Sequence, residues 1–212
     1  MNRVEIKRRA KEFAFNNKWN IWKGVLFVAI ITGFAMGIGM ALQGVFKDNK
    51  LIPVIINLVL SIGVFPLSIG LVSYLINLIK GNNPDLVSTV FSKYKEGYMW
   101  KIILVSILAE LIIFGWSLVL IIPGIICAYK FAMTNYVLAE QTPEELENGE
   151  AAYKVSTKLM DGYKLDFFVF NLSFIGWFFL GSLTFGIAYI WVMPYYTTAC
   201  VMYYEELKKV SR

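Results

Sequence analysis

The sequence contains no histidine among its 212 residues, and only two cysteines. Without histidine, the chain lacks the commonest general base, the commonest zinc ligand and the usual pH switch near neutrality. Cys127 and Cys200 both lie within apolar stretches, which excludes a disulfide framework and predicts two packed thiols. The apolar stretches also contain no clustered set of acids, and no Ser or Cys nucleophile beside a plausible base. We therefore expect a protein that is not an enzyme and that holds no metal and no cofactor.

Charged residues are scarce as well. They make up 17% of the chain, against 58% hydrophobic residues, and the mean hydropathy is +0.59. The apolar residues lie in long continuous stretches separated by short charged segments, which is typical of a polytopic helical membrane protein. The net charge of +5 comes from basic residues beside these stretches, where the control of membrane topology explains them. We therefore expect no binding to nucleic acid.

The lengths of the apolar stretches predict the fold. A bilayer core of about 30 Å is crossed by about 20 helical residues. The prediction is an all-α, polytopic membrane protein with six transmembrane helices as three hairpins, each preceded by a cytoplasmic amphipathic helix, all within a single membrane domain at 1–212. The surface helices are predicted at 2–17, 84–97 and 143–161, and the transmembrane helices at 21–46, 51–79, 101–121, 123–139, 165–184 and 186–205.

Two of the hairpin turns lie inside long apolar stretches. Ile102 to Ala139 is too long for one crossing. Its "LIIPG" segment predicts a reversal, because Pro123 favours the start of a new helix and Gly124 eases the turn. The alternative is one kinked helix that continues into the cytoplasm or along the membrane surface. In the last apolar stretch, "LTFG" is expected to form the second such turn.

The distribution of basic residues predicts the orientation. Most of them lie in the N-terminal segment, in the two segments that join the hairpins, and at the C-terminus, whereas only Lys47 and Lys50 fall on the other side. The positive-inside rule then places both termini in the cytoplasm. No small-residue cleavage site follows a short apolar core, so 21–46 is expected to be a retained helix and not a signal peptide.

The segments that precede the three hairpins share start and end signals. Asn83-Pro84 and Thr142-Pro143 each combine a helix N-cap residue with proline at the first helical position, and Asn2 with Glu5 is a weaker version. Three diverged copies of one unit are one explanation; the other is that every hairpin needs the same start signals. Gly97 and Gly162 suit helix C-caps, and the second helix of each hairpin carries a proline, at Pro66, Pro123 or Pro194.

Two ionisable residues fall well inside predicted spans. Glu110 and Lys130 are at similar depths in the second hairpin, and we predict that they form an intramembrane ion pair. A structural pair that holds two helices in register is the favoured interpretation. The functional alternative makes Glu110 a proton-binding or cation-binding site whose pKa depends on Lys130.

Two further groups of residues are candidates for packing or binding. A stripe of small residues at four-residue spacing predicts close packing of the first transmembrane helix, inside the bundle or against a second subunit: Ala29, Gly33, Gly37 and Ala41. Polar and aromatic groups of the last hairpin predict a cavity for an amphipathic molecule, with interhelical hydrogen bonds and an aromatic belt as the alternative: Pro194, Tyr195, Tyr196, Asn171 and Thr197. A break of the helix at Pro194 is expected to free backbone carbonyls toward that cavity.

Two surfaces suggest partners. The first amphipathic helix combines an apolar face with basic residues, which predicts contact with membrane lipids, although a cluster that only sets topology is an alternative. The acidic segment 140–150 is a candidate surface for a protein partner. The sequence indicates no oligomeric state.

The motifs "IIPGIICAYKFAMTNYVLAE", "VSTKLMDGYKLDFF", "LSFIGWFFLGSLTFGI" and "MPYYTTACVMYYEEL" follow one another along the chain. With them the chain resembles a family of bacterial integral membrane proteins known as domain of unknown function nine-seven-five. This resemblance implies a multipass protein of the bacterial cytoplasmic membrane and brings no catalytic residues with it. A looser resemblance links the Pro-Gly turn and "STKLMDG" to the membrane region of some glycerophosphodiester phosphodiesterases, which implies membrane or lipid association alone.

Together these observations predict a non-enzymatic multipass membrane protein that handles or senses a membrane-resident or amphipathic ligand, as a transporter-like, accessory or immunity-type protein. A structural partner subunit of a membrane complex is the alternative. A lipid-active intramembrane enzyme is the least favoured, because the chain lacks the residues that such chemistry needs.

Overall fold

A computed structural model of the chain describes residues 2–46, 51–95, 99–142, 144–145 and 151–211. Within these residues every long regular element is an α-helix, as predicted. The helices are α1 (Arg3–Asn16), α2 (Lys18–Val45), α3 (Leu51–Ile79), α4 (Leu86–Lys95), α5 (Met99–Val119), α6 (Ile121–Lys130), α7 (Thr134–Glu140), α9 (Ala152–Leu159), α10 (Lys164–Leu172), α11 (Ile175–Leu183) and α12 (Tyr189–Val210).

Five segments of the described chain are long and apolar enough to cross a membrane: 18–45, 51–79, 99–118, 121–140 and 164–183. Two of them are not single helices, because a turn at 131–133 separates α6 from α7 and another at 173–174 separates α10 from α11. The sixth predicted span, 186–205, corresponds to α12 and is not among the five. The reason is its composition, since α12 is rich in tyrosine and ends with the charged run "EELKK".

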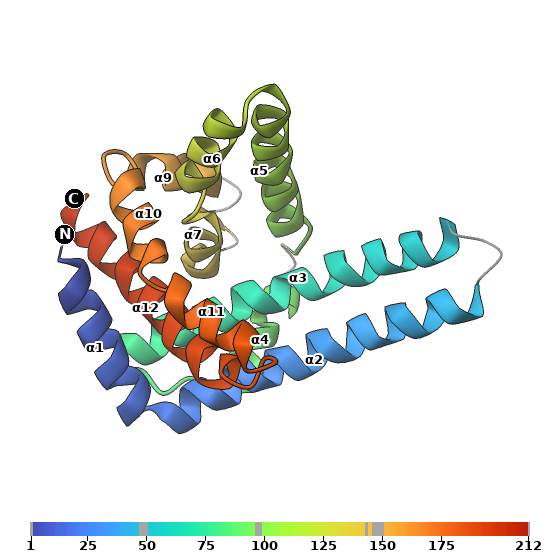
Figure 1. The fold of residues 1–212 in the computed structure, drawn as a ribbon, viewed down its shortest axis with the longest axis horizontal. Coiled ribbons are helices and arrows are strands. Elements are labelled where there is room, and N and C mark those ends of the chain that lie inside the picture. The colour runs from blue at the N-terminus through green and yellow to red at the C-terminus, as the bar shows by residue number, and fades with distance from the viewer. Residues whose placement is uncertain (1, 47–50, 96–98, 143, 146–150, 212) are drawn as a thin grey trace.

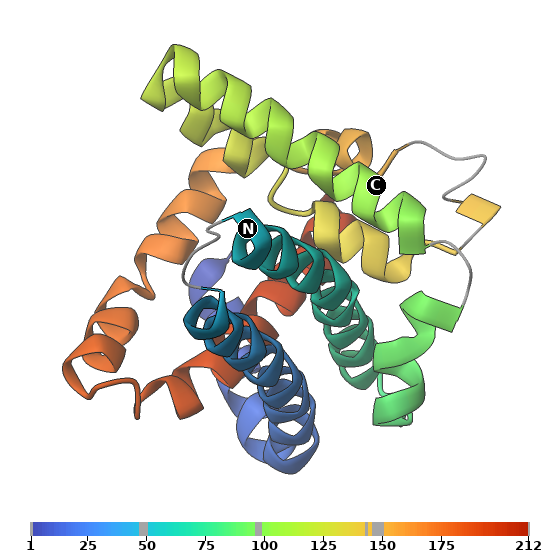
Figure 2. The same cartoon turned by 90° about the vertical axis from the view of Figure 1, so that its right-hand side faces the viewer.

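The helices form hairpins, but the hairpins diverge. Figure 1 shows α2 and α3 as one long hairpin that extends away from the other helices, while α5 and α6 form a second hairpin that points in a different direction. In Figure 2 the first of these hairpins points toward the viewer and the second does not. In the third, α12 returns beside α10 and α11 (Figure 1). The six crossings predicted from the sequence are therefore not seen side by side. The first helix, α1, packs along α12 and brings the two chain ends close together.

The two predicted turns have distinct backbone signatures. The chain leaves α5 through Leu120, whose extended backbone (φ −155°, ψ 139°) reverses its direction three residues before Pro123. A Cβ on Gly124 would overlap Ser117 Oγ and lie 2.7 Å from Ser117 Cα, so glycine permits the close contact of α6 with α5. The turn before α12 contains Gly186 with φ +92°.

The helix starts agree with the predicted signals at two of three places. Asn2 Oδ1 accepts a hydrogen bond from the Glu5 N–H (3.2 Å). Thr142 and Glu145 cap each other reciprocally, with hydrogen bonds of 2.9 and 3.3 Å. At α4 the predicted cap, Asn83, is wrong. The capping residue is Asp85, whose carboxylate accepts a hydrogen bond from the Ser88 N–H (2.8 Å). Gly162 has a left-handed backbone (φ +76°) but is not the C-cap, because α9 ends at Leu159 and its C-cap is Met160; Gly97 lies outside the described residues.

Buried aromatic rings hold α10 against α12. Tyr203 is fully buried, and its ring centroid lies 4.8 Å from that of Phe167 and 4.9 Å from that of Phe170. The Tyr203 hydroxyl donates to Asp166 Oδ2 (2.9 Å), and Asp166 also pairs with Arg3 (3.4 Å). This core therefore ties α1, α10 and α12 together.

A cluster of polar side chains joins the C-terminal ends of α3, α7 and α12, the helices at which the three hairpins end. Glu140, at the end of α7, accepts hydrogen bonds from Lys208 (2.7 and 2.8 Å), from Lys80 just after α3 (2.5 Å) and from the Tyr204 hydroxyl (2.7 Å). Glu205 pairs with Lys208 as well (2.9 Å). Burial lowers the pKa of Lys80, but the hydrogen bond to Glu140 and the charges of both glutamates outweigh this effect and raise it. We call these five residues the Glu140 cluster.

The close contact of α3 with α4 depends on a glycine. A Cβ added to Gly70 would overlap the carbonyl oxygen of Val90 and lie 2.8 Å from both its carbonyl carbon and its Cα. The atoms in the way belong to the backbone, so a rotamer change cannot relieve the overlap. By contrast, Gly63 on the same helix faces open space.

Candidate functional site

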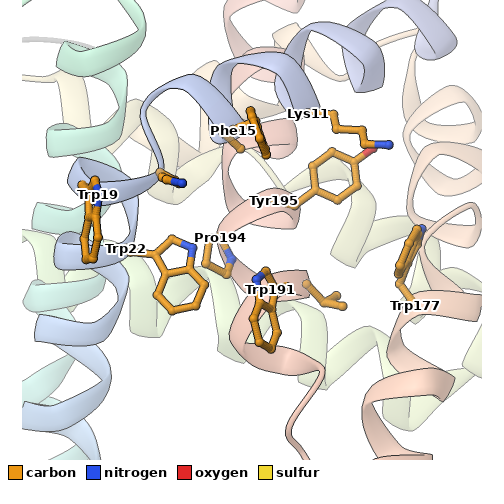
Figure 3. Close-up of a pocket in the computed structure, with 11 residues that line it drawn as sticks. Lys11, Phe15, Trp19, Trp22, Trp177, Trp191, Pro194 and Tyr195 are labelled. Carbon is orange, nitrogen blue, oxygen red and sulfur yellow. The ribbon is translucent and has the colours of Figure 1, made fainter.

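A cavity of about 580 Å³ lies where the junction of α1 and α2 meets α11 and the start of α12 (Figure 3). Aromatic side chains from all four helices form most of its wall. Four of the six tryptophans of the chain take part. The lining consists of Lys11, Ala14, Phe15, Lys18, Trp19, Trp22, Trp177, Trp191, Val192, Pro194 and Tyr195. We call it the tryptophan cavity.

The walls are large, flat and open to the outside of the protein. The rings of Trp22 and Trp191 meet edge to face, with centroids 5.7 Å apart and an interplanar angle of 72°. Trp19, Trp177 and Trp191 are all at least half exposed. Because indole rings present an apolar face and one N–H donor, such a wall suits a molecule that is largely apolar with a polar end.

Two lysines add positive charge to this aromatic wall. Lys11 projects from α1 beside Tyr195 in Figure 3, and the side chains of Lys11 and Lys18 are exposed. The Nζ of Lys18 lies 5.6 Å from the centre of the Phe15 ring. The described residues give neither lysine a carboxylate partner. An anionic group at the mouth of the cavity would therefore meet two available ammonium groups.

The residues predicted from the last hairpin divide into two groups. Pro194 and Tyr195 line the tryptophan cavity. The other three bond within the protein: the Tyr196 hydroxyl donates to Asn171 Oδ1 (2.7 Å), and the Thr197 hydroxyl donates to the Met193 carbonyl (2.9 Å). The expected break at Pro194 is absent, because α12 runs through it as one helix.

Sequence reasoning missed the other wall of the cavity. Lys18, Trp19 and Trp22 belong to the motif "NNKWNIWK", for which no binding site was predicted. The same aromatic-basic composition was the signal available for a binding site. Its contact with Trp191, 169 residues away from Trp22, could not be read from the local pattern.

The structure does not bring Glu110 and Lys130 together. Among the described residues no ion pair joins them, and the Lys130 Nζ lies 5.8 Å from the centre of the Phe131 ring. Lys130 is the last residue of α6, because the helix stops at the turn 131–133. Glu110 is exposed and lines a second cavity, of about 470 Å³, between α3 and α5.

The stripe of small residues does not pack inside the protein. Ala29, Gly33, Gly37 and Ala41 are all exposed, and a Cβ on either glycine would meet nothing within 4 Å. Two other glycines of α2 make the close contacts with α3. A Cβ on Gly24 would lie 3.1 Å from Leu71 and Tyr74, and one on Gly39 would overlap the side chain of Asn57.

The acidic segment is only partly available for a partner. Glu140 is 22% exposed and is engaged in the Glu140 cluster, whereas Glu144 and Glu145 are exposed. The rest of the predicted surface, at 143 and 146–150, lies outside the described residues. No group of three or more His, Cys, Asp or Glu side chains within the described part of the chain is arranged to hold a metal ion.

Comparison with known proteins supports one of the two resemblances. Neither a curated protein nor a solved structure matches the chain, so the looser likeness to the membrane region of glycerophosphodiester phosphodiesterases is not shown. One family model does match, and it covers α6, α7 and α9 to α12 together with the end of α5. Residues 117–211 match the family model described as Protein of unknown function (DUF975).

Proposed function

We propose that this chain is a non-enzymatic, multipass protein of the bacterial cytoplasmic membrane that handles or senses a membrane-resident amphipathic ligand, which it binds in the tryptophan cavity. The observation that carries the proposal is the cavity itself, which combines a wall of four indoles with two lysines that have no carboxylate partner in the described part of the chain. Its volume of about 580 Å³ lies within the range of roughly 300–1,000 Å³ that small-molecule sites occupy.

The position of the cavity supports a ligand that comes from the bilayer. Lys18 and Trp19 stand at the start of α2, the first helix long and apolar enough to cross a membrane. Tryptophan and lysine at the end of such a helix favour the level of the lipid head groups. With both termini in the cytoplasm, as the basic residues favour, the cavity opens toward the inner leaflet.

The charge of the cavity indicates which end of the ligand lies where. An acidic head group would bind near Lys11 and Lys18, where ammonium groups are exposed to water. The apolar part would lie between Trp22, Trp177 and Trp191. We therefore favour an anionic amphiphile.

Tryptophan fluorescence tests this directly. In a variant with Trp100→Phe and Trp116→Phe, every remaining tryptophan lines the cavity. The variant is placed in lipid nanodiscs and titrated with 11-bromoundecanoate, whose bromine quenches indole on contact. The proposal predicts quenching that saturates near one molecule per chain.

The complementary variant is the matched control. It keeps Trp100 and Trp116, which are 64% and 52% exposed, and replaces the four cavity tryptophans by phenylalanine. Its quenching should rise in proportion to the amount of probe dissolved in the bilayer. Saturation in both variants, or in neither, would remove the proposal and favour the alternative, a structural subunit of a membrane complex.

The lysines give a second, independent readout. Replacing Lys11 and Lys18 together by glutamine should weaken the binding of 11-bromoundecanoate about fivefold, because exposed charge pairs contribute modestly. The binding of 11-bromoundecanol, which carries no charge, should stay the same. An equal loss for both probes would show that the lysines do not recognise an acidic head group.

A further inference from the structure

The second cavity lies between the middle of α3 and the face of α5 that contacts it. Its volume is about 470 Å³. Apolar side chains form most of the wall, and the polar groups are two serines and one carboxylate. The lining consists of Ser61, Ile62, Phe65, Ile103, Ser106, Ile107, Glu110, Leu111 and Phe114. We call it the Glu110 cavity.

Glu110 has no partner of its own in the described part of the protein. No hydrogen bond or ion pair reaches its carboxylate. It is the twelfth of the 21 residues of α5, so it lies near the middle of a helix that is long and apolar enough to cross a membrane. An ionised carboxylate at that depth costs at least about 2.5 kcal/mol without a partner. The site therefore favours the arrival of a positive charge.

Ser106 provides a second, independent sign of a missing ligand. It lines the same cavity, is only 8% exposed, and its hydroxyl has no hydrogen-bond partner among the residues that the structure describes. It precedes Glu110 by four residues, so the two side chains share one face of α5. A buried hydroxyl is costly when it is left unpaired. By contrast, the hydroxyl of Ser117 on the same helix donates to the Ile113 carbonyl (2.8 Å).

We propose that the Glu110 cavity binds a hydrophobic amine in its protonated, ammonium form. The ammonium N–H groups donate to the Glu110 carboxylate and to the Ser106 hydroxyl, and the apolar body of the amine contacts Phe65, Ile107 and Phe114. The depth of the site selects a free hydrophobic amine over the amine of a lipid head group, which stays at the membrane surface. This site does not rest on the function proposed for the tryptophan cavity, because it has other helices and the opposite charge.

Carbodiimide labelling measures whether an amine occupies the site. Dicyclohexylcarbodiimide is hydrophobic and activates protonated carboxyl groups, which then rearrange to a stable acylurea or couple to an amine as an amide with release of dicyclohexylurea. Mass spectrometry of the digested chain therefore follows the loss of unmodified Glu110, which counts both products. In nanodiscs of phosphatidylglycerol, saturating octylammonium should slow this modification about tenfold. The same concentration of 1-octanol, which has the same tail and no charge, should leave the rate unchanged.

Matched serine variants test the geometry. Ser106→Ala should weaken protection by octylammonium about fivefold, as expected for the loss of one hydrogen bond. Ser117→Ala is the control, and in this variant octylammonium should protect Glu110 as well as it does in the unchanged protein. Equilibrium dialysis of octylammonium gives a readout that does not depend on labelling: Glu110→Gln should bind about tenfold more weakly, and Glu145→Gln, at an exposed carboxylate, should bind normally.

Four outcomes would overturn the proposal. Equal protection by octanol would mean that the cavity recognises only apolar chains. Protection by neither compound, with labelling that simply falls as the pH rises, would leave Glu110 as a proton-binding group. Protection that appears only when phosphatidylethanolamine is added would assign the site to a lipid head group. Labelling blocked in native membranes and restored by purification would assign it to a protein partner.

Discussion

Glu140→Gln should loosen the contact between the three hairpins more than any other single conservative substitution in the Glu140 cluster. The substitution preserves the shape of the side chain and removes its charge. It weakens the hydrogen bonds from Lys80 and Lys208, and it leaves two cations near one remaining carboxylate, that of Glu205. Each charge-assisted hydrogen bond contributes about 1.5–3 kcal/mol when buried.

The partial exposure of the cluster reduces the expected cost. The side chains of Glu140 and Lys208 are 22% and 25% exposed, but that of Lys80 is 44% exposed. Water can therefore compensate for much of the weakened hydrogen bond between Lys80 and Glu140. The amide oxygen of glutamine also keeps one acceptor. We therefore expect a loss of about 2–3 kcal/mol in the free energy of opening. This corresponds to a population of the open state about 30- to 150-fold larger.

Cys200 is a suitable reporter, because it lies in α12 and is only 1% exposed. In a Cys127→Ser background, N-ethylmaleimide reacts with Cys200 only after the helices open, and its rate follows the open population when closing is fast. Glu206→Gln is the matched control, since Glu206 pairs with the more exposed Lys209 and Arg9, and it should change the rate less than fivefold. A Glu140→Gln rate within fivefold of the unchanged protein would mean that Glu140 does not hold the three hairpins together.

Three other predictions concern glycine packing, capping and pH. Gly70→Ala should lower the free energy of unfolding in mild detergent by about 1–3 kcal/mol, because its Cβ would meet the backbone of α4, whereas Gly63→Ala should be neutral or stabilising. Asp85→Ala should lower the free energy of unfolding by about 1 kcal/mol, and Asn83→Ala should leave it unchanged. The reverse order would mean that Asn83, and not Asp85, caps α4. The raised pKa of Lys80 means that its contribution is complete below the ordinary lysine pKa and is lost as the pH rises through the raised value. Between pH 10 and 12 the melting temperature should therefore fall further for the unchanged protein than for Lys80→Gln, and equal slopes would contradict this.

The sequence predicted those features that depend on local chemistry. Long apolar stretches predicted five of the segments suited to crossing a membrane, and the pattern of Thr142 and Glu145 predicted a capping box that the structure contains. The reversal near "LIIPG" followed from a stretch too long for one helix. In each case a few neighbouring residues decide the structure.

The wrong or incomplete predictions concern the side of a helix on which a residue lies. Spacing alone put Glu110 and Lys130 at the same depth, but Glu110 lines the side of α5 that contacts α3, and Lys130 lies at the end of α6. Spacing likewise identified the stripe through Gly33 and Gly37, but not that it faces outward. Which face of a helix is buried depends on partners far away in the sequence.

The tryptophan cavity shows the same limit. Pro194 and Tyr195 were predicted as its residues from composition, and Trp22 was not, because its contact with Trp191 exists only after α2 packs beside α12. Similarly, Glu140 looked like part of an exposed acidic surface until three helix ends met around it. Local sequence predicts which residues are suited to a site, and the packing of distant helices decides which of them form it.

Native mass spectrometry of the protein released gently from its own membranes shows whether the tryptophan cavity holds a ligand. We expect a chain that retains one amphipathic acidic molecule, and loss of that molecule in a variant that carries Trp22→Ala and Trp191→Ala. A bare chain, or the same bound molecule in both proteins, would contradict the assignment of the tryptophan cavity as the ligand site.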